Sequence, residues 1–295
     1  MDFTLRPMST SEVLDRMFYL YKQNFVLFAG IAIFPAAALL LINLLQVSGS
    51  VAPRITGMPA IGIGAGSGIL LLFVIYLIAA VMASASTVYA LSVVHLGKTT
   101  SFGESYKNIR PYFWRLVRLG LLLFIILVGI GIVIAIPIGV SVVMTPFALL
   151  GIPIAIAGLV FIVHFYARIS FSTAACVLEN SGAVQSIQRS LFLTKGRTGR
   201  VWLVLLLTII LNWALAFAIV FPISITTEIT HSTLASQIGV AIGQFIATVL
   251  SSPILAISLV LLYYDERVRK EAFDLQYMMA AIEQPAQQQA ASAGQ

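Results

Sequence analysis

The sequence has little charge and almost no cysteine. Only 9% of its 295 residues are Asp, Glu, Lys or Arg, against about 25% in ordinary soluble domains, while 60% are hydrophobic. A soluble fold cannot bury so much apolar surface or stay dissolved with so few charges, so the apolar side chains must face lipid. The single cysteine, Cys176, excludes an internal disulfide framework and a cysteine-rich metal site, and argues against redox chemistry.

Long apolar runs predict six membrane spans, since crossing about 30 Å of hydrocarbon takes about 20 helical residues. One run, from Leu119 to about Tyr166, is long enough for two spans, and Pro146, Gly151 and Pro153 mark a reversal within it. The expected spans are about 25–45, 69–96, 119–141, 152–172, 201–222 and 238–264. The expected fold class is therefore all-α, a polytopic membrane protein with six transmembrane helices in a single membrane domain of residues 1–283.

Basic residues fall very unevenly on the two sides of this arrangement. With the N-terminus in the cytoplasm, the inner side holds every Lys and Arg except Arg54. The positive-inside rule therefore predicts that both termini are cytoplasmic. The net charge of +6 then belongs to the inner face of the membrane, so we expect no nucleic acid partner. Topology alone can explain this charge, and a specific anionic ligand is the alternative.

Three short amphipathic helices are expected on the cytoplasmic side, each before an outward-going span. They cover about 9–23, 101–115 and 181–194. The first has the capping-box pair Ser9 and Glu12, and the second repeats this spacing. The order of helix, span and span thus occurs three times, which suggests a three-fold repeat. Independent interfacial helices with aromatic and basic anchors are the alternative.

The C-terminal segment is the densest charge cluster. Arg267 and Glu271 stand four residues apart, the spacing of a favourable ion pair on a helix. We expect the last span to continue as a cytoplasmic helix over 265–283. Residues 284–295 are of low complexity and are expected to be a disordered tail.

Four stretches outside the spans resemble a known family. It is the prokaryotic glycerophosphoryl diester phosphodiesterase membrane-domain family, with neighbouring families of unknown function. The stretches are LRPMSTSEVLDRMFYLYKQNF, LGKTTSFGESYKNIRPYFWRL, VLENSGAVQSIQRSLFLTKGR and LLYYDERVRKEAFDLQ. The resemblance implies six helices in a bacterial or archaeal plasma membrane. In that family the membrane part is an appendage of a separate catalytic domain, for which this chain has no room, so we expect no phosphodiesterase activity.

The sequence offers no catalytic or metal-binding constellation. His95, His164 and His231 lack a spacing such as H-E-x-x-H, and Glu228 with His231 supplies too few ligands for a metal. The span interiors contain no ionisable residue of the kind that marks a proton-coupled carrier or an intramembrane metalloprotease. We therefore expect no enzyme activity, no metal and no cofactor.

The polar groups inside the spans leave two residues of interest, Asn212 and Gln244. They are candidates for a site at membrane depth, and hydrogen bonding between helices is the alternative. In the last span, Gly239 and Gly243 form a G-x-x-x-G pattern. This pattern allows close helix packing within the chain or in a homo-oligomer.

The leading hypothesis is a non-enzymatic scaffold or accessory domain. Through a basic cytoplasmic belt, it would bind anionic membrane lipids or a membrane or cytoplasmic protein partner. The candidate contacts are Lys22, Arg110, Arg115, Arg118, Arg197, Arg200 and Trp202. The alternative is a transporter or exporter of an apolar or amphipathic solute. Such a transporter would use the third and sixth spans, which contain Pro137 and Pro253, together with the amides of Asn212 and Gln244. It requires a cavity at the membrane midplane.

Overall fold

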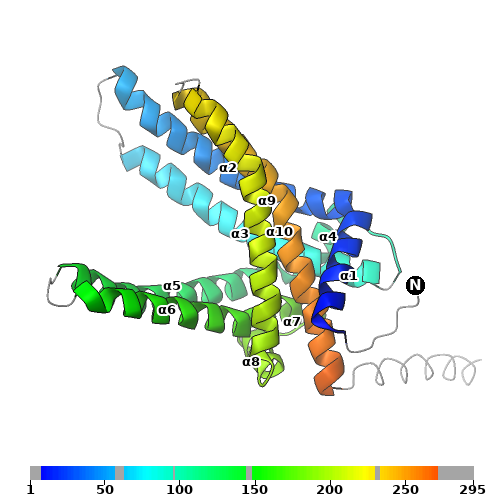
Figure 1. Cartoon of the computed structure of the whole chain (residues 1–295). Coiled ribbons are helices and arrows are strands. Elements are labelled where there is room, and N and C mark those ends of the chain that lie inside the picture. The colour runs from blue at the N-terminus through cyan, green and yellow to red at the C-terminus, as the bar shows by residue number, and fades with distance from the viewer. Residues whose placement is uncertain (1–7, 57–62, 96, 144–147, 230–232, 272–295) are drawn as a thin grey trace, which may run out of the picture.

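A computed structural model describes residues 8–56, 63–95, 97–143, 148–229 and 233–271, which are helical almost throughout and contain no strand (Figure 1). Six helices contain a stretch long and apolar enough to cross a membrane. They are α2 (Phe25–Thr56), α3 (Ile63–His95), α5 (Phe113–Val143), α6 (Ala148–Ile169), α9 (Thr198–Ile229) and α10 (Thr233–Glu271). The expected fold class, an all-helical polytopic membrane protein, is confirmed.

The shorter elements gather at one end of the molecule, where α1, α7 and α8 lie against α10 and α4 lies against α3 (Figure 1). They are α1 (Thr10–Gln23), α4 (Phe102–Ile109), the 3-10 turn η1 (Arg110–Tyr112), α7 (Ser172–Leu178) and α8 (Ala183–Thr194). We call this the basic end. The capping box of α1 is formed, because Ser9 Oγ accepts from the Glu12 N–H at 3.2 Å and the Glu12 carboxylate accepts from the Ser9 N–H at 2.7 Å.

Several element bounds differ from the expected ones. The helix expected over 101–115 ends at Ile109, and after the turn at Pro111 a new helix begins at Phe113, six residues before the expected span. The fourth long helix ends at Ile169, short of the expected residue 172, and the separate helix α7 follows. The break coincides with Ser170 and Ser172, whose hydroxyls donate to carbonyls three residues earlier and so compete with the helical pattern.

The expected helix over 265–283 is continuous with α10 as far as Glu271. The rest of that segment, and the tail over 284–295, lie outside the described residues. The element order does contain a short helix followed by two long helices three times, with α7 as an addition to the second unit.

The long helices form two groups. Helices α2, α3, α9 and α10 lie together, while α5 and α6 form a hairpin that diverges from them with distance from the basic end (Figure 1). The hairpin is tight within itself, because Ile134 of α5 leaves no room for a Cβ at Gly158 of α6. By contrast, a Cβ added at Gly129, Gly131 or Gly139 of α5 would meet nothing within 4 Å. The part of the hairpin far from the basic end therefore has open surroundings.

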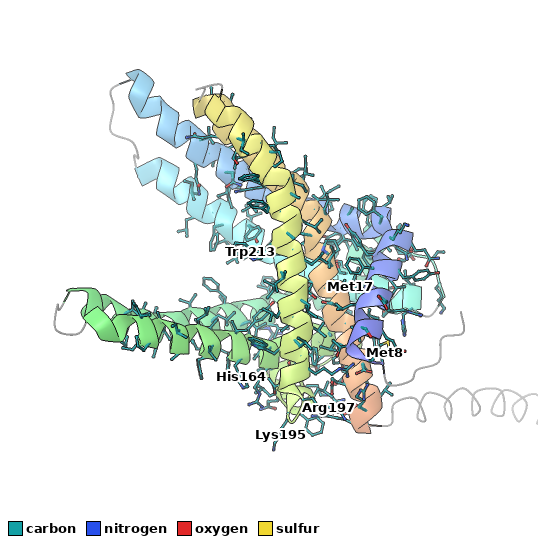
Figure 2. All side chains as sticks on the ribbon, viewed as in Figure 1. Met8, Met17, His164, Lys195, Arg197 and Trp213 are labelled. Carbon is teal, nitrogen blue, oxygen red and sulfur yellow. The ribbon has the colours of Figure 1, made fainter. Side chains whose placement is uncertain are left out.

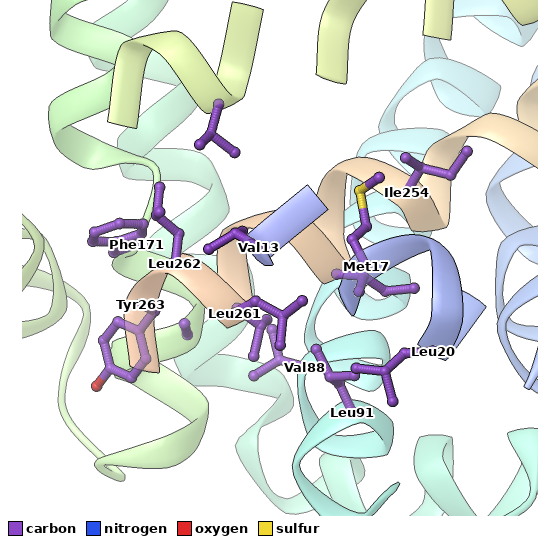
Figure 3. Close-up of a cluster of buried hydrophobic side chains, with 14 of the residues drawn as sticks. Val13, Met17, Leu20, Val88, Leu91, Phe171, Ile254, Leu261, Leu262 and Tyr263 are labelled. Atoms are coloured by element: carbon purple, nitrogen blue, oxygen red, sulfur yellow. The ribbon is translucent and has the colours of Figure 1, made fainter. Parts of the chain in front are cut away.

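The buried core sits near the basic end, where the short helices pack on the long ones. Figure 3 shows Val13 and Met17 of α1 beside Val88 of α3 and Leu261 of α10. Elsewhere many large apolar side chains are exposed, as expected for helices that face lipid. This packing fixes α1 against the bundle.

Tyrosine hydroxyls add polar anchors between the short and long helices. The Tyr21 hydroxyl, at the end of α1, donates to the carbonyl of Leu250 in α10 at 2.7 Å. Burial raises the pKa of Tyr21, so it stays a neutral donor at physiological pH. The Tyr106 hydroxyl of α4 donates to the carbonyl of Ile31 in α2 at 2.8 Å. Two of the short helices thus hold a long helix through a tyrosine.

Candidate functional site

Two carboxylates are buried where α10 leaves the bundle. The side chains of Asp265 and Glu266 have no exposed surface, and Arg200, near the start of α9, forms ion pairs with both. Arg269 adds a bond from its Nε to Asp265 at 2.8 Å. Buried charges are tolerated only when paired and hydrogen-bonded, so this cluster must be assembled as a unit.

The same cluster binds the backbone of Met8, just before α1. The Met8 N–H donates to Asp265 Oδ1 at 2.6 Å, and its carbonyl accepts from Arg200 at 2.6 Å and from Arg269 at 2.5 Å. Figure 2 shows Met8 next to the last turns of α10. Arg200 lies 192 positions from Met8 along the chain, and Asp265 lies 257 positions from it. Residues distant in sequence therefore hold the backbone of Met8 in place.

A second ionic cluster joins α7, α8 and α10. Arg189 of α8 bridges Glu179, which follows α7, at 2.8 Å and Glu271 at 2.5 Å. The Tyr263 hydroxyl donates to Glu179 at 2.6 Å, and Arg267 lies 3.4 Å from Glu271. Burial alone would lower the pKa of Arg189, but its bonds to Glu271 and Glu179 outweigh this and raise the pKa. Arg189 thus stays charged, and the expected Arg267–Glu271 pair is confirmed.

These clusters engage some of the basic residues that the sequence offered as ligand contacts. Arg200 keeps only 17% of its side chain exposed. Arg115 donates to the backbone and side-chain oxygens of Asn180, and Trp202 packs partly buried against the core. Arg197 is 43% exposed and lies 4.0 Å from Glu266. Arg200 and Trp202 therefore hold the fold together and present little surface to a ligand.

The other candidates remain outside these clusters. Lys22, Arg110 and Arg118 are exposed, and no described carboxylate pairs with them. Lys98, Lys107 and Lys195 share both properties, although the sequence gave no reason to single them out from the other basic residues. Figure 2 shows Lys195 in the turn between α8 and α9, at the outer tip of the basic end.

The two mid-membrane amides have different partners. Asn43 Nδ2 donates to Gln244 Oε1 at 3.0 Å, which joins α2 to α10. Asn212 Nδ2 instead donates to the Thr208 carbonyl of its own helix at 2.8 Å, so the alternative of bonding between helices holds for Gln244 and not for Asn212. The amide pair lines a groove of about 340 Å³ together with Gln46 and Gln237.

The remaining residues considered from the sequence fall at separate places. Gly243 packs within the chain, since a Cβ there would lie 2.8 Å from Ile223 of α9. His95 stacks on Tyr264 with ring centroids 5.5 Å apart, and His164 is exposed on α6 (Figure 2). His231 lies outside the described residues. Among the described residues, no three His, Cys, Asp or Glu side chains gather as metal ligands would.

Fold and charge distribution together define a class: a six-helix membrane protein with a charged helical layer at one end of its bundle. The chain belongs to the family described as "Domain of unknown function (DUF7847)", whose model matches residues 21–265. This match covers the first five long helices and α10 as far as Asp265. No curated protein and no solved structure matches the chain.

Proposed function

We propose that this protein is a non-enzymatic scaffold or accessory protein that binds anionic lipid headgroups through its basic end. The observation that carries the proposal is a separation of charge. Inside the basic end, arginines form ion pairs with four carboxylates, those of Glu179, Asp265, Glu266 and Glu271. By contrast, six exposed basic side chains have no described carboxylate partner. These six are Lys22, Lys98, Lys107, Arg110, Arg118 and Lys195.

The proposal includes a location. The basic end faces the cytoplasm of a prokaryotic cell, with both termini inside, because the positive-inside rule places exposed Lys and Arg there. Anionic lipids of the inner leaflet attract such residues by about 1 kcal/mol each. The resemblance to the phosphodiesterase membrane-domain family supports a prokaryotic plasma membrane, and the absence of a catalytic constellation from the sequence supports a non-enzymatic role.

Native mass spectrometry of the protein in mixed phosphatidylglycerol and phosphatidylcholine nanodiscs tests this proposal. Replacing Lys22, Arg110, Arg118 and Lys195 with Gln should remove most of the preference for retained phosphatidylglycerol. At about 1 kcal/mol per residue, the summed attraction is about 4 kcal/mol, an upper limit for the change. The matched control exchanges Lys for Arg and Arg for Lys at the same four positions, which keeps the charge. An unchanged lipid preference in the Gln variant contradicts the proposal, and a stoichiometric protein partner in the native membrane would favour the partner alternative.

A transporter of an apolar or amphipathic solute is the second candidate. The observation in its favour is the amide-lined groove of about 340 Å³, which reaches the lower size range of ligand pockets, about 300–1,000 Å³. Proteoliposomes provide the test, because Gln244→Leu should abolish solute uptake if the groove lies on the path. Uptake that this variant leaves intact would argue against the groove.

A further inference from the structure

A second cavity lies where the α5–α6 hairpin leaves the other long helices. Its volume is about 120 Å³, and its wall includes residues of α3, α5, α6, α7 and α10. Most of the lining is apolar, for example Leu123 and Leu127 of α5 and Val260 of α10. Its lining residues from α3, α5 and α10 belong to helices apolar enough to cross a membrane, while Thr173 and Ala174 belong to α7, so the cavity lies where the long helices join the basic end.

Three hydroxyl groups in this lining make no hydrogen bond within the described part of the chain. They belong to Ser84 of α3, Tyr166 of α6 and Thr173 of α7. Thr208 shows the usual alternative on a long helix, since its hydroxyl bonds back to the Val204 carbonyl at 2.8 Å. The Ser86 hydroxyl of α3 is also unpaired within the described residues, but it lies away from the cavity. An unpaired hydroxyl in a hydrocarbon environment costs about 1–3 kcal/mol. Three such hydroxyls around one cavity therefore point to an occupant with hydrogen-bonding groups.

The lining also limits the charge and size of the occupant. It contains no Asp, Glu, Lys, Arg or His, so nothing there would compensate a charged headgroup. A cavity of about 150 Å³ accepts a benzene molecule, so about 120 Å³ accommodates a group of roughly glycerol size. The occupant is thus a small uncharged group that donates and accepts hydrogen bonds.

An apolar chain attached to that group would have a path out of the cavity. Leu123 and Leu127 line the cavity, and Gly131 follows four residues later on the same face of α5. A Cβ at Gly131 would meet nothing within 4 Å, and the hairpin diverges from α3 in this direction (Figure 1). An apolar chain can therefore run from the cavity along α5 into the surrounding lipid.

We propose that this cavity binds the uncharged polar end of a neutral lipid, with a hydroxyl or ester group inside and its apolar chain along α5. The ligand class differs from the anionic headgroups proposed for the basic end, and the cavity contains none of the basic residues invoked there. The site is therefore independent of that function. Diacylglycerol and long-chain alcohols share the required chemistry.

Photolabelling of the full chain in phosphatidylcholine nanodiscs tests the site. Three photoactivatable probes are compared: a diacylglycerol, hexadecanol and a phosphatidylglycerol. The test variant combines Tyr166→Phe with Thr173→Val, which removes two hydroxyls and nearly keeps the volume. The matched control is Ser86→Ala, because the Ser86 hydroxyl is fully buried on α3 but does not line the cavity. A second variant, Ala256→Leu, fills the cavity from α10.

We expect a neutral probe to label α5 and α6 near the cavity. The Tyr166→Phe and Thr173→Val double variant should lower this labelling about tenfold, since it loses two hydrogen bonds, and Ser86→Ala should leave it unchanged. Ala256→Leu should lower it as well, and the stronger of the two neutral probes identifies the lipid type. Equal labelling by phosphatidylglycerol, labelling spread evenly over all long helices, no labelling, or labelling that neither variant lowers would overturn the proposal and leave water as the occupant.

Discussion

Replacing Arg200 should destabilise the protein more than replacing any of the exposed basic residues would. Arg200 pairs with Asp265 and Glu266, whose side chains have no exposed surface, and it donates to the Met8 carbonyl at 2.6 Å. Breaking a buried ion pair on one side costs about 3–5 kcal/mol. Arg269 stays 2.8 Å from Asp265, so compensation is only partly lost and we expect Arg200→Met to cost about 3 kcal/mol.

Denaturation of the purified protein in mixed micelles measures this cost. The thiol of Cys176 is fully buried, so its reaction with a maleimide reports unfolding without an engineered cysteine. Arg110→Met is the control, because Arg110 is exposed and should change the free energy of unfolding by less than about 0.5 kcal/mol.

A double variant separates charge from packing. Without Arg200, the ion pair that Glu266 keeps among the described residues is with Arg197, 4.0 Å away. Adding Glu266→Gln to Arg200→Met removes this poorly compensated carboxylate and should recover at least half of the lost stability. A cost below about 1 kcal/mol for Arg200→Met, or simple additivity in the double variant, would refute the view that buried charge dominates this cluster.

Two further predictions concern the hairpin and the topology. Gly158→Ala should destabilise the protein by about 1–3 kcal/mol, because the new Cβ displaces Ile134, whereas Gly131→Ala should be neutral or stabilising, as measured by the same denaturation assay. Equal effects of both substitutions would contradict the tight α5–α6 contact. Charged reporter tags inserted at Gly49 and Lys98 should be accessible from opposite sides of the membrane, with Lys98 inside the cell, and access from the same side would rule out the proposed topology.

Local sequence patterns predicted the main elements well. Five apolar runs, one of them long enough for two spans, gave six long helices, because lipid requires each span to satisfy its own backbone hydrogen bonds. The capping pair Ser9 and Glu12 and the pair Arg267 and Glu271 formed as expected, since each connects residues within one helical turn. Helix α7 was missed, because Ser170 and Ser172 interrupt an otherwise apolar run without a proline or glycine.

The candidate residues at the basic end could be chosen from the sequence only by side and charge. Lys22, Arg110 and Arg200 look alike in that respect, although only Arg200 lies next to Asp265 and Glu266. Arg200 and Asp265 are 65 residues apart in the sequence, so no helical spacing predicts their contact. Likewise, the hydroxyls of Ser84, Tyr166 and Thr173 come from three helices, and only their packing brings them to one cavity.

The sequence by itself determined that this chain is a six-helix membrane protein with its basic residues predicted on one side. Both conclusions rest on the cost of exposing backbone and charge to lipid, a cost that acts on each segment separately. Tertiary structure alone decided which basic residues form ion pairs with buried carboxylates, where the α5–α6 hairpin diverges from the other long helices, and which polar groups line one cavity. Those outcomes depend on contacts between residues far apart in the chain, which composition and periodicity do not specify.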